Sequence, residues 1–168
     1  MEHAHALSIA EQAHTALAPS CDRIEIAGSI RRLKPEVKDI ELVAIPRLVP
    51  AGLFGDEREV DPKFCAIVNQ WPKVKGEPTG KYTQRVLPGG MKLDLFIADA
   101  ENWGLILAVR TGSAAFSHQV LGRRWVQRGY TSVGGRLTRG GVVIPIHEET
   151  DLFALLQLPW VEPWAREM

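Results

Sequence analysis

Acidic residues alternate with apolar residues at two places in the chain. Asp39 and Glu41 are separated by one isoleucine, and Asp94 has a leucine on either side. Side chains two residues apart in a strand share a face, so Asp39 and Glu41 would point the same way while their apolar neighbours face a core. Carboxylate oxygens are the ligands that hard divalent cations prefer. We therefore expect strands over 38–45 and 91–97 that bring the three carboxylates together at a metal site.

A glycine–serine pair precedes the first of these strands. Residues 22–27 alternate polar and apolar side chains as a half-buried strand does, and Gly28 and Ser29 interrupt the alternation. Serine often caps helices, so we expect Ser29 to start a short helical turn that carries Arg31 and Arg32. The free backbone N–H groups of such a turn, together with two guanidinium groups, suit a polyphosphate. This stretch predicts a phosphate site directly before the metal-binding strand.

Length and composition are those of an ordinary globular protein. The chain has 168 residues, a formal net charge of zero and two cysteines, Cys21 and Cys65. This length predicts one domain, or one domain with a small appended lobe, and a substantial core. No apolar run is long enough to cross a membrane, and the N-terminus lacks the pattern of a signal peptide. Two cysteines fit a reduced, cytoplasmic protein without disulfides.

Charge is distributed unevenly although its total is zero. Residues 105–140 contain no acidic side chain but six arginines: Arg110, Arg123, Arg124, Arg128, Arg136 and Arg139. A basic segment beside a carboxylate cluster is what an enzyme that handles polyanions with metal ions requires. A solvated face that serves solubility alone is the other interpretation of such a segment.

The remaining pattern alternates helices with strands. We expect helices over 2–18, from Asp61–Pro62 to about Trp71, over 101–109, from Ser113 to about Arg128, and from Thr150 or Asp151 onward. We expect a strand over 81–87 that turns at Gly89–Gly90 into the Asp94 strand, and short strands within 130–146. Pro46 to Asp61 contains Pro50, Gly52 and Gly55, which is typical of a loop. Antiparallel pairing beside two earlier strands indicates a mixed sheet rather than a doubly wound one.

Three separated motifs occur in one order along the chain. They are Gly28-Ser29-x-Arg31-Arg32 with Asp39-x-Glu41, then Lys92-Leu93-Asp94-Leu95, and then Arg110-Thr111-Gly112-Ser113 with Phe116. Over about residues 22–168 the chain resembles DNA polymerase family X, the polymerase beta-like nucleotidyltransferases, and residues 148–153 and 158–167 are similar to the C-terminal signature of that family. The resemblance implies an α+β fold. It consists of a nucleotidyltransferase palm over 1–104, with a mixed β-sheet flanked by helices, and a small C-terminal α/β, thumb-like lobe over 105–168.

The resemblance also implies a role for each motif. Such enzymes use two divalent cations, Mg²⁺ or Mn²⁺, to clamp the attacking and leaving oxygens of an in-line displacement. Asp39 and Glu41 would hold both cations, and Asp94 would hold the catalytic one and assist deprotonation of a primer 3′-hydroxyl. The nucleoside triphosphate would be held by Gly28, Ser29, Arg32, Thr111, Gly112 and Ser113. DNA would be contacted by Arg110, Arg123, Arg124, Arg128 and Arg136.

Two departures from the family pattern leave the subclass open. Glu41 stands where the polymerases usually have aspartate, and Val109 and Arg110 stand where aromatic residues are common. One candidate function is a compact DNA polymerase that adds dNMP from dNTP to a primer and fills short gaps. Another is a nucleotidyltransferase that works without a template on nucleic acid, protein or a small molecule, and a third is a non-catalytic module that binds DNA ends or nucleotides. We expect a monomer whose partners are primed or gapped DNA and nucleoside triphosphates.

Overall fold

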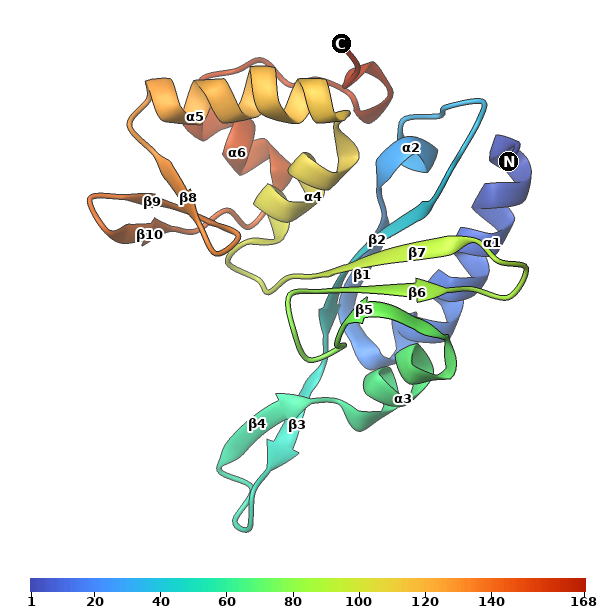
Figure 1. Ribbon diagram of the computed structural model, residues 1–168. Helices are drawn as coiled ribbons and strands as arrows, with labels where there is room; N and C mark the ends of the chain where they lie inside the picture. Colours follow the sequence, from blue (N-terminus) through green and yellow to red (C-terminus); the bar gives the residue numbers. More distant parts are fainter.

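A mixed sheet of five strands forms the centre of the larger, N-terminal lobe (Figure 1). The computed structural model describes all 168 residues. In sheet order the strands are β1 (Cys21–Ile26), β2 (Ile40–Pro46), β7 (Lys92–Ile97), β6 (Tyr82–Val86) and β5 (Lys73–Gly76). Only β2 and β7 run parallel, and every other neighbouring pair is antiparallel. The predicted mixed sheet is therefore confirmed.

Two helices cover one face of this sheet. α1 (His3–Leu17) and α3 (Pro62–Gln70) pack against the apolar side chains of the central strands, among them the completely buried Ile40 and Leu42. Asp61 begins α3 as predicted, because its Oδ1 accepts a hydrogen bond of 2.9 Å from the backbone N–H two residues later. Neither of these two helices covers the opposite face of the sheet, which carries the polar side chains of the same strands.

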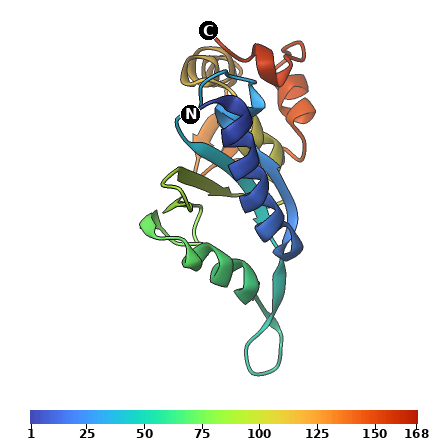
Figure 2. The same cartoon turned by 90° about the vertical axis from the view of Figure 1, so that its right-hand side faces the viewer.

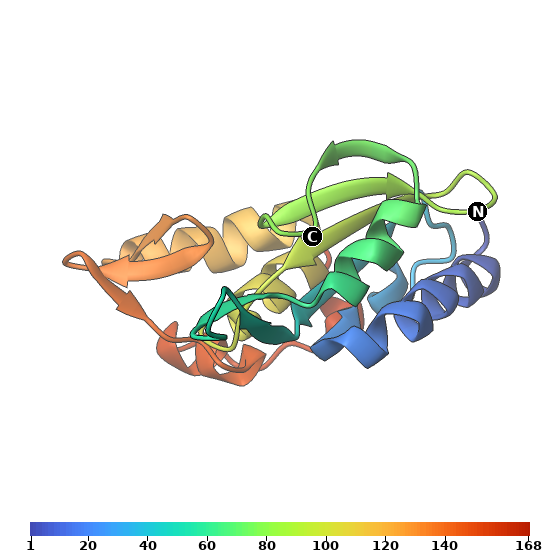
Figure 3. The same cartoon turned by 90° about the horizontal axis from the view of Figure 1, so that it is seen from below.

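The C-terminal lobe, residues 105–168, has an apolar core of its own and lies beyond one end of the sheet (Figure 3). Its helices are α4 (Trp103–Thr111), which begins in the larger lobe, a π-helical turn (Phe116–Gly122) followed by α5 (Arg123–Gln127), and α6 (Glu149–Leu155). Its strands are β8 (Thr131–Val133), β9 (Arg136–Arg139) and β10 (Val142–Ile144), which form an antiparallel sheet. Short 3₁₀ turns occur at Ala18–Ser20 and Pro163–Ala165. Ser113 caps the helix after α4 as predicted, since its Oγ accepts a bond of 3.0 Å from the N–H of Phe116.

Residues 48–60 form a hairpin where the sequence predicted a loop. β3 (Leu48–Ala51) pairs antiparallel with β4 (Glu57–Val60), and this arm projects away from both lobes (Figures 1 and 2). At its tip Leu53 and Phe54 are 91% and 86% exposed. The strands escaped prediction because each is only four residues long and the segment contains a proline and turn-forming glycines.

Two helix starts also differ from the prediction. Ser29 lies inside α2 (Gly28–Arg31) rather than before it, because Ala27 takes the extended N-cap conformation. α6 begins after Glu148, whose backbone N–H donates to the side chain of Asp151, so the cap lies upstream of both predicted positions. Glutamate is a weaker N-cap residue than threonine or aspartate, so N-cap preferences favoured the two later positions. None of the helices has the length and apolar character needed to cross a membrane.

Candidate active site

Polar side chains from three neighbouring strands line up on the open face of the sheet. The register places Glu41 of β2 beside Asp94 of β7, and Asp94 beside Gln84 of β6. Their apolar neighbours on the same strands are buried under α1 and α3. The alternation predicted for both strands is confirmed, and Asp39 stands one residue before β2.

Two residues of β6 hold the carboxylate of Asp94. The hydroxyl of Tyr82 and the side-chain amide of Gln84 both donate hydrogen bonds to Oδ1 of Asp94, the second over 2.8 Å. The other oxygen, Oδ2, accepts no hydrogen bond. Burial, followed by the bond to Asp94, raises the pKa of Tyr82, so its hydroxyl stays protonated and remains a donor at neutral pH.

The three carboxylates repel one another in partly buried positions. Burial and then the charge of Asp94 raise the pKa of Asp39. Burial, followed by the charges of Asp39 and Asp94, raises the pKa of Glu41 to about 7. None of the three forms an ion pair with a basic side chain. Uncompensated negative charge of this kind attracts cations.

The chemistry of these donors fits divalent cations. Carboxylate oxygens suit Mg²⁺ and Mn²⁺, which are the cations that the family resemblance implies. As the side chains stand, however, no three acidic, histidine or cysteine residues are close enough together to form a complete metal-binding group. Mutual repulsion keeps the carboxylates apart, and the positive charge of a bound cation would counteract this repulsion and draw them together. Metal binding by Asp39, Glu41 and Asp94 remains a prediction.

Gly28 makes room for the carboxylate of Glu41. Its φ is +62°, in the left-handed region, and a β-carbon at this position would lie 1.8 Å from Oε2 of Glu41. The backbone N–H of Ala27 also donates to the carbonyl oxygen of Glu41 over 2.9 Å. The glycine therefore serves two purposes, because it permits the turn and lets Glu41 lie against the start of α2.

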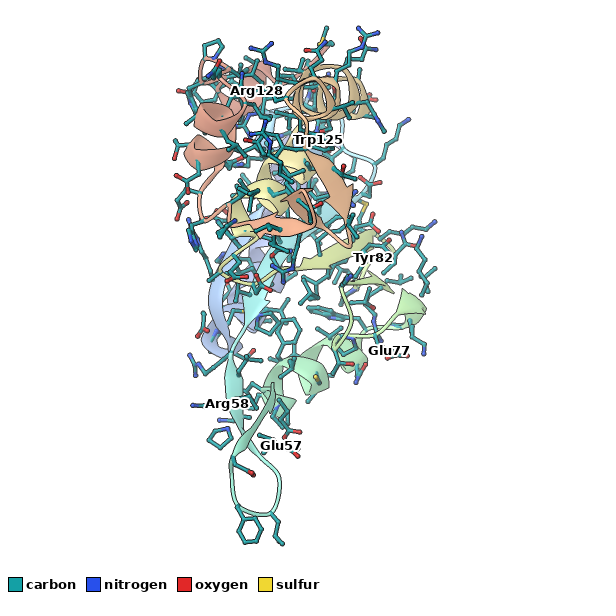
Figure 4. The ribbon with its side chains drawn as sticks, turned by 90° about the vertical axis from the view of Figure 1, so that its left-hand side faces the viewer. Glu57, Arg58, Glu77, Tyr82, Trp125 and Arg128 are labelled. Atoms are coloured by element: carbon teal, nitrogen blue, oxygen red, sulfur yellow. The ribbon has the colours of Figure 1, made fainter.

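A cavity of about 1070 Å³ lies beside the carboxylates and has residues of both lobes in its lining. It is lined by Glu41 and Asp94, by Tyr82 and Phe96 on neighbouring strands, and by Arg110 of α4. Figure 4 shows Tyr82 directly below the C-terminal lobe. The volume is that of a pocket for a small ligand or for part of a larger one.

The residues predicted to hold a nucleotide do not line this cavity. The lining includes none of Gly28, Ser29, Arg32, Thr111, Gly112 and Ser113. Arg32 donates to Glu167 over 2.5 Å and to the carbonyl oxygen of Thr111 over 2.7 Å. Ser29 has a buried Oγ without a hydrogen-bond partner. The structure thus places Arg32 against the C-terminal lobe, and the role of these residues toward nucleotide remains a prediction.

An ion network that the sequence did not predict joins the two lobes. Glu149 of α6 accepts hydrogen bonds from Arg31 over 2.7 Å and from Arg166 over 2.5 Å, and both Glu149 and Arg166 are buried. Arg31 also donates to the hydroxyl of Thr111 over 2.7 Å. We call Arg31, Glu149 and Arg166 the junction network. Through this network Arg31 of the short helix α2 is bonded to Glu149, which lies 118 positions later in the chain.

The arginines predicted to contact DNA have different surroundings. Arg110 and Arg136 line the cavity. Arg124 and Arg128 form hydrogen bonds with residues at the end of α6, and Arg123 is exposed. Figure 4 shows Arg128 on the outer part of the C-terminal lobe, away from Tyr82. Only Arg110 and Arg136 therefore share the cavity with the carboxylates.

The polar residues of the cavity that the sequence did not predict include Tyr82, Gln84, Lys75 and Lys81. Tyr82 and Gln84 alternate within a predicted strand, so period two would have grouped them on one face. The missing information was the register of β6 against β7, which places Gln84 beside Asp94. Lys75 belongs to an irregular edge strand and Lys81 precedes β6, and no local signal marks either one.

Two comparisons with known proteins bear on this chain. A search of curated protein sequences found no match. Residues 106–167 match a family model described as DNA polymerase beta thumb. The matched segment begins within α4 and covers nearly all of the C-terminal lobe. Over this part the predicted relationship to family X is supported, and the C-terminal lobe is similar to the thumb of DNA polymerase beta.

Proposed function

We propose that this chain is a nucleotidyltransferase that adds a nucleotide to the 3′-hydroxyl of a DNA strand. One observation carries the proposal: Glu41 and Asp94 lie side by side on parallel strands, with Asp39 one residue before the first of them, next to a lobe similar to a polymerase thumb. Divalent cations, when bound, would activate the hydroxyl and neutralise the charge on the leaving group.

The three carboxylates would divide two tasks, binding of the cations and acceptance of the proton. Tyr82 and Gln84 both engage Oδ1 of Asp94, so Oδ2 would remain to receive the proton of the attacking hydroxyl or to bind a cation. Asp39 and Glu41 would hold the cations, since neither forms an ion pair that a cation would have to displace.

The position of the basic residues supports DNA as the partner. Lys75, Lys81 and Arg110 line the cavity that holds Glu41 and Asp94, so positive charge lies beside the proposed metal ligands. Phosphate contacts of this kind supply most of the affinity of proteins for nucleic acids. A polymerase thumb-like lobe beside the cavity agrees with the same partner.

Primer extension tests the proposal. The protein is incubated with labelled primer, dNTPs and Mg²⁺ or Mn²⁺ on single-stranded, primed and gapped DNA. We expect extension by the natural chain and by Asp56→Asn, which alters an exposed acid in the arm, and none by Asp94→Asn or Asp39→Ala. Extension that follows the template would identify a polymerase, and extension that ignores it would identify a template-independent transferase.

One observation favours a second candidate, a non-catalytic module that binds DNA. The three carboxylates do not form a complete metal-binding group as they stand, and Arg32 is engaged by Glu167. DNA binding without any extension, under both metals and on all three substrates, would support this module and refute the transferase.

A further inference from the structure

Two aromatic rings, each with a basic side chain over its face, line the cavity. The register pairs Tyr82 of β6 with Phe96 of β7, and their ring centroids lie 5.1 Å apart. The ammonium of Lys75 lies 5.2 Å from the centre of the Tyr82 ring, and the guanidinium of Arg110 lies 4.1 Å from that of Phe96. All four residues line the cavity, and we call the two rings the aromatic floor.

The two cations on the floor have no acidic partner. Neither Lys75 nor Arg110 takes part in an ion pair, whereas Arg136 in the same cavity pairs with Asp99. An aromatic ring face attracts a cation but does not neutralise its charge. Both side chains have long, flexible stems, so each can move from a ring face to a bound anion. The floor therefore combines stacking surface with free positive charge.

The cavity has the volume of a site for a small ligand, such as a single nucleotide. It measures about 1070 Å³, and the turn at Gly134 and Gly135 of the C-terminal lobe contributes to its lining. The side-chain amide of Asn102 donates to the carbonyl oxygen of Gly135 in this turn over 3.1 Å, which fixes the turn at the cavity wall. The bases of an unpaired strand can enter a space of this size singly.

We propose that the aromatic floor holds the unpaired 3′-terminal nucleotide of an acceptor strand. Its base would stack on Tyr82 or Phe96, and its phosphate would lie between Lys75 and Arg110. Single-stranded nucleic acids are bound in this way, by aromatic side chains under the bases and basic side chains along the backbone. The terminal hydroxyl would then lie beside Asp94, because Tyr82, one of the two rings, donates a hydrogen bond to that carboxylate. The assignment of the hydroxyl to Asp94 rests on the proposed function.

Binding without metal or nucleotide tests the inference. We would measure the fluorescence anisotropy of a labelled thymidine octamer and of a blunt duplex of equal length, in EDTA. The octamer is expected to bind about tenfold or more tightly than the duplex, because a base stacked on an aromatic side chain contributes about 1–3 kcal/mol. Replacing Phe96 with leucine should weaken octamer binding roughly 5- to 150-fold, the range for loss of one stacked base. Phe54→Leu, which changes an exposed aromatic residue in the arm, should leave the affinity unchanged.

Two surface variants keep the test decisive if Phe96→Leu fails to fold. Lys75→Gln and Arg110→Gln remove charge without removing a core side chain, and each should lower the slope of log affinity against log salt by about 0.7. Equal binding of octamer and duplex, an unchanged salt slope in both variants, or equal loss in Phe54→Leu would overturn the inference. Displacement of the octamer by metal-free dTTP would also overturn it, since the floor would then be a site for the incoming nucleotide.

Failure of this inference and failure of the proposed function have different signatures. If the protein extends primers but binds the octamer no better than the duplex, the proposed function stands and the proposed acceptor site is refuted. If the protein binds the octamer through Phe96, Lys75 and Arg110 but never extends a primer, the proposed site stands and the proposed function is refuted.

Discussion

Replacing Glu41 with glutamine is expected to stabilise the protein at about pH 8 and to change its stability little at about pH 4. In the folded chain the pKa of Glu41 rises from 4.5 to about 7, because the side chain is buried and Asp39 and Asp94 are close. A raised carboxyl pKa means that the folded state binds the proton more tightly than the unfolded state. The stability that protonated Glu41 contributes is therefore fully present below pH 4.5 and is lost as the pH rises to about 7.

The size of this effect follows from the pKa shift. One pKa unit corresponds to about 1.4 kcal/mol, so ionised Glu41 costs the folded chain about 3 kcal/mol. In a protein of this length 1 kcal/mol moves Tm by about 2–4 °C. The Tm of Glu41→Gln should therefore exceed that of the natural chain by roughly 6–12 °C at about pH 8.

Thermal unfolding followed by circular dichroism, in EDTA and across about pH 4–8, measures this difference directly. Glu57→Gln is the matched control, because Glu57 is exposed in the arm and its substitution should produce no pH-dependent difference in Tm. A difference between Glu41→Gln and the natural chain that stays constant across this range would refute the reasoning. The same holds if the variant is no more stable at the alkaline end.

Three further predictions follow from the same structure. Gly28→Ala should lower Tm, because the new methyl group would lie 1.8 Å from Oε2 of Glu41. The variant should also lack any increase in Tm that Mn²⁺ produces in the natural chain. Melting curves with and without Mn²⁺ measure both effects. Glu149→Gln should cost about 3–5 kcal/mol in urea denaturation, because it leaves the arginines of the junction network without their acid. Arg23→Gln, which breaks an exposed ion pair, should cost under about 1 kcal/mol in the same assay, and equal losses would contradict the assigned role of burial. Replacing the arm, residues 48–60, with a short glycine linker should leave Tm within about 4 °C, since the arm contributes little buried surface; a larger fall would contradict this account.

Local patterns were sufficient for the features that depend on period and capping. The two-residue period of β2 and β7 correctly divided Glu41 and Asp94 from the apolar residues that pack under the helices. Asp61 and Ser113 were correctly predicted as helix caps, because a cap depends only on residues within one turn.

Contacts between distant residues could not be predicted in this way. Arg31 and Arg32 were expected to bind phosphate, yet their hydrogen-bond partners include Glu149 and Glu167, which lie 118 and 135 positions later. No local pattern shows which acid an arginine will pair with across such a separation. The same reasoning applies to Tyr82, whose bond to Asp94 depends on the register between two strands.

The dependence of α2 on these distant partners has a consequence for synthesis. A ribosome delivers the chain from its N-terminus, so the sheet strands through β7 emerge long before Glu149 and Glu167. Until then, the nascent N-terminal lobe has a pair of arginines close to Gly28 whose acidic partners have not yet been made. The turn at Gly28 would thus reach its native surroundings only after residues 149–167 have been synthesised, and a nascent chain arrested before residue 149 should leave that turn susceptible to proteases.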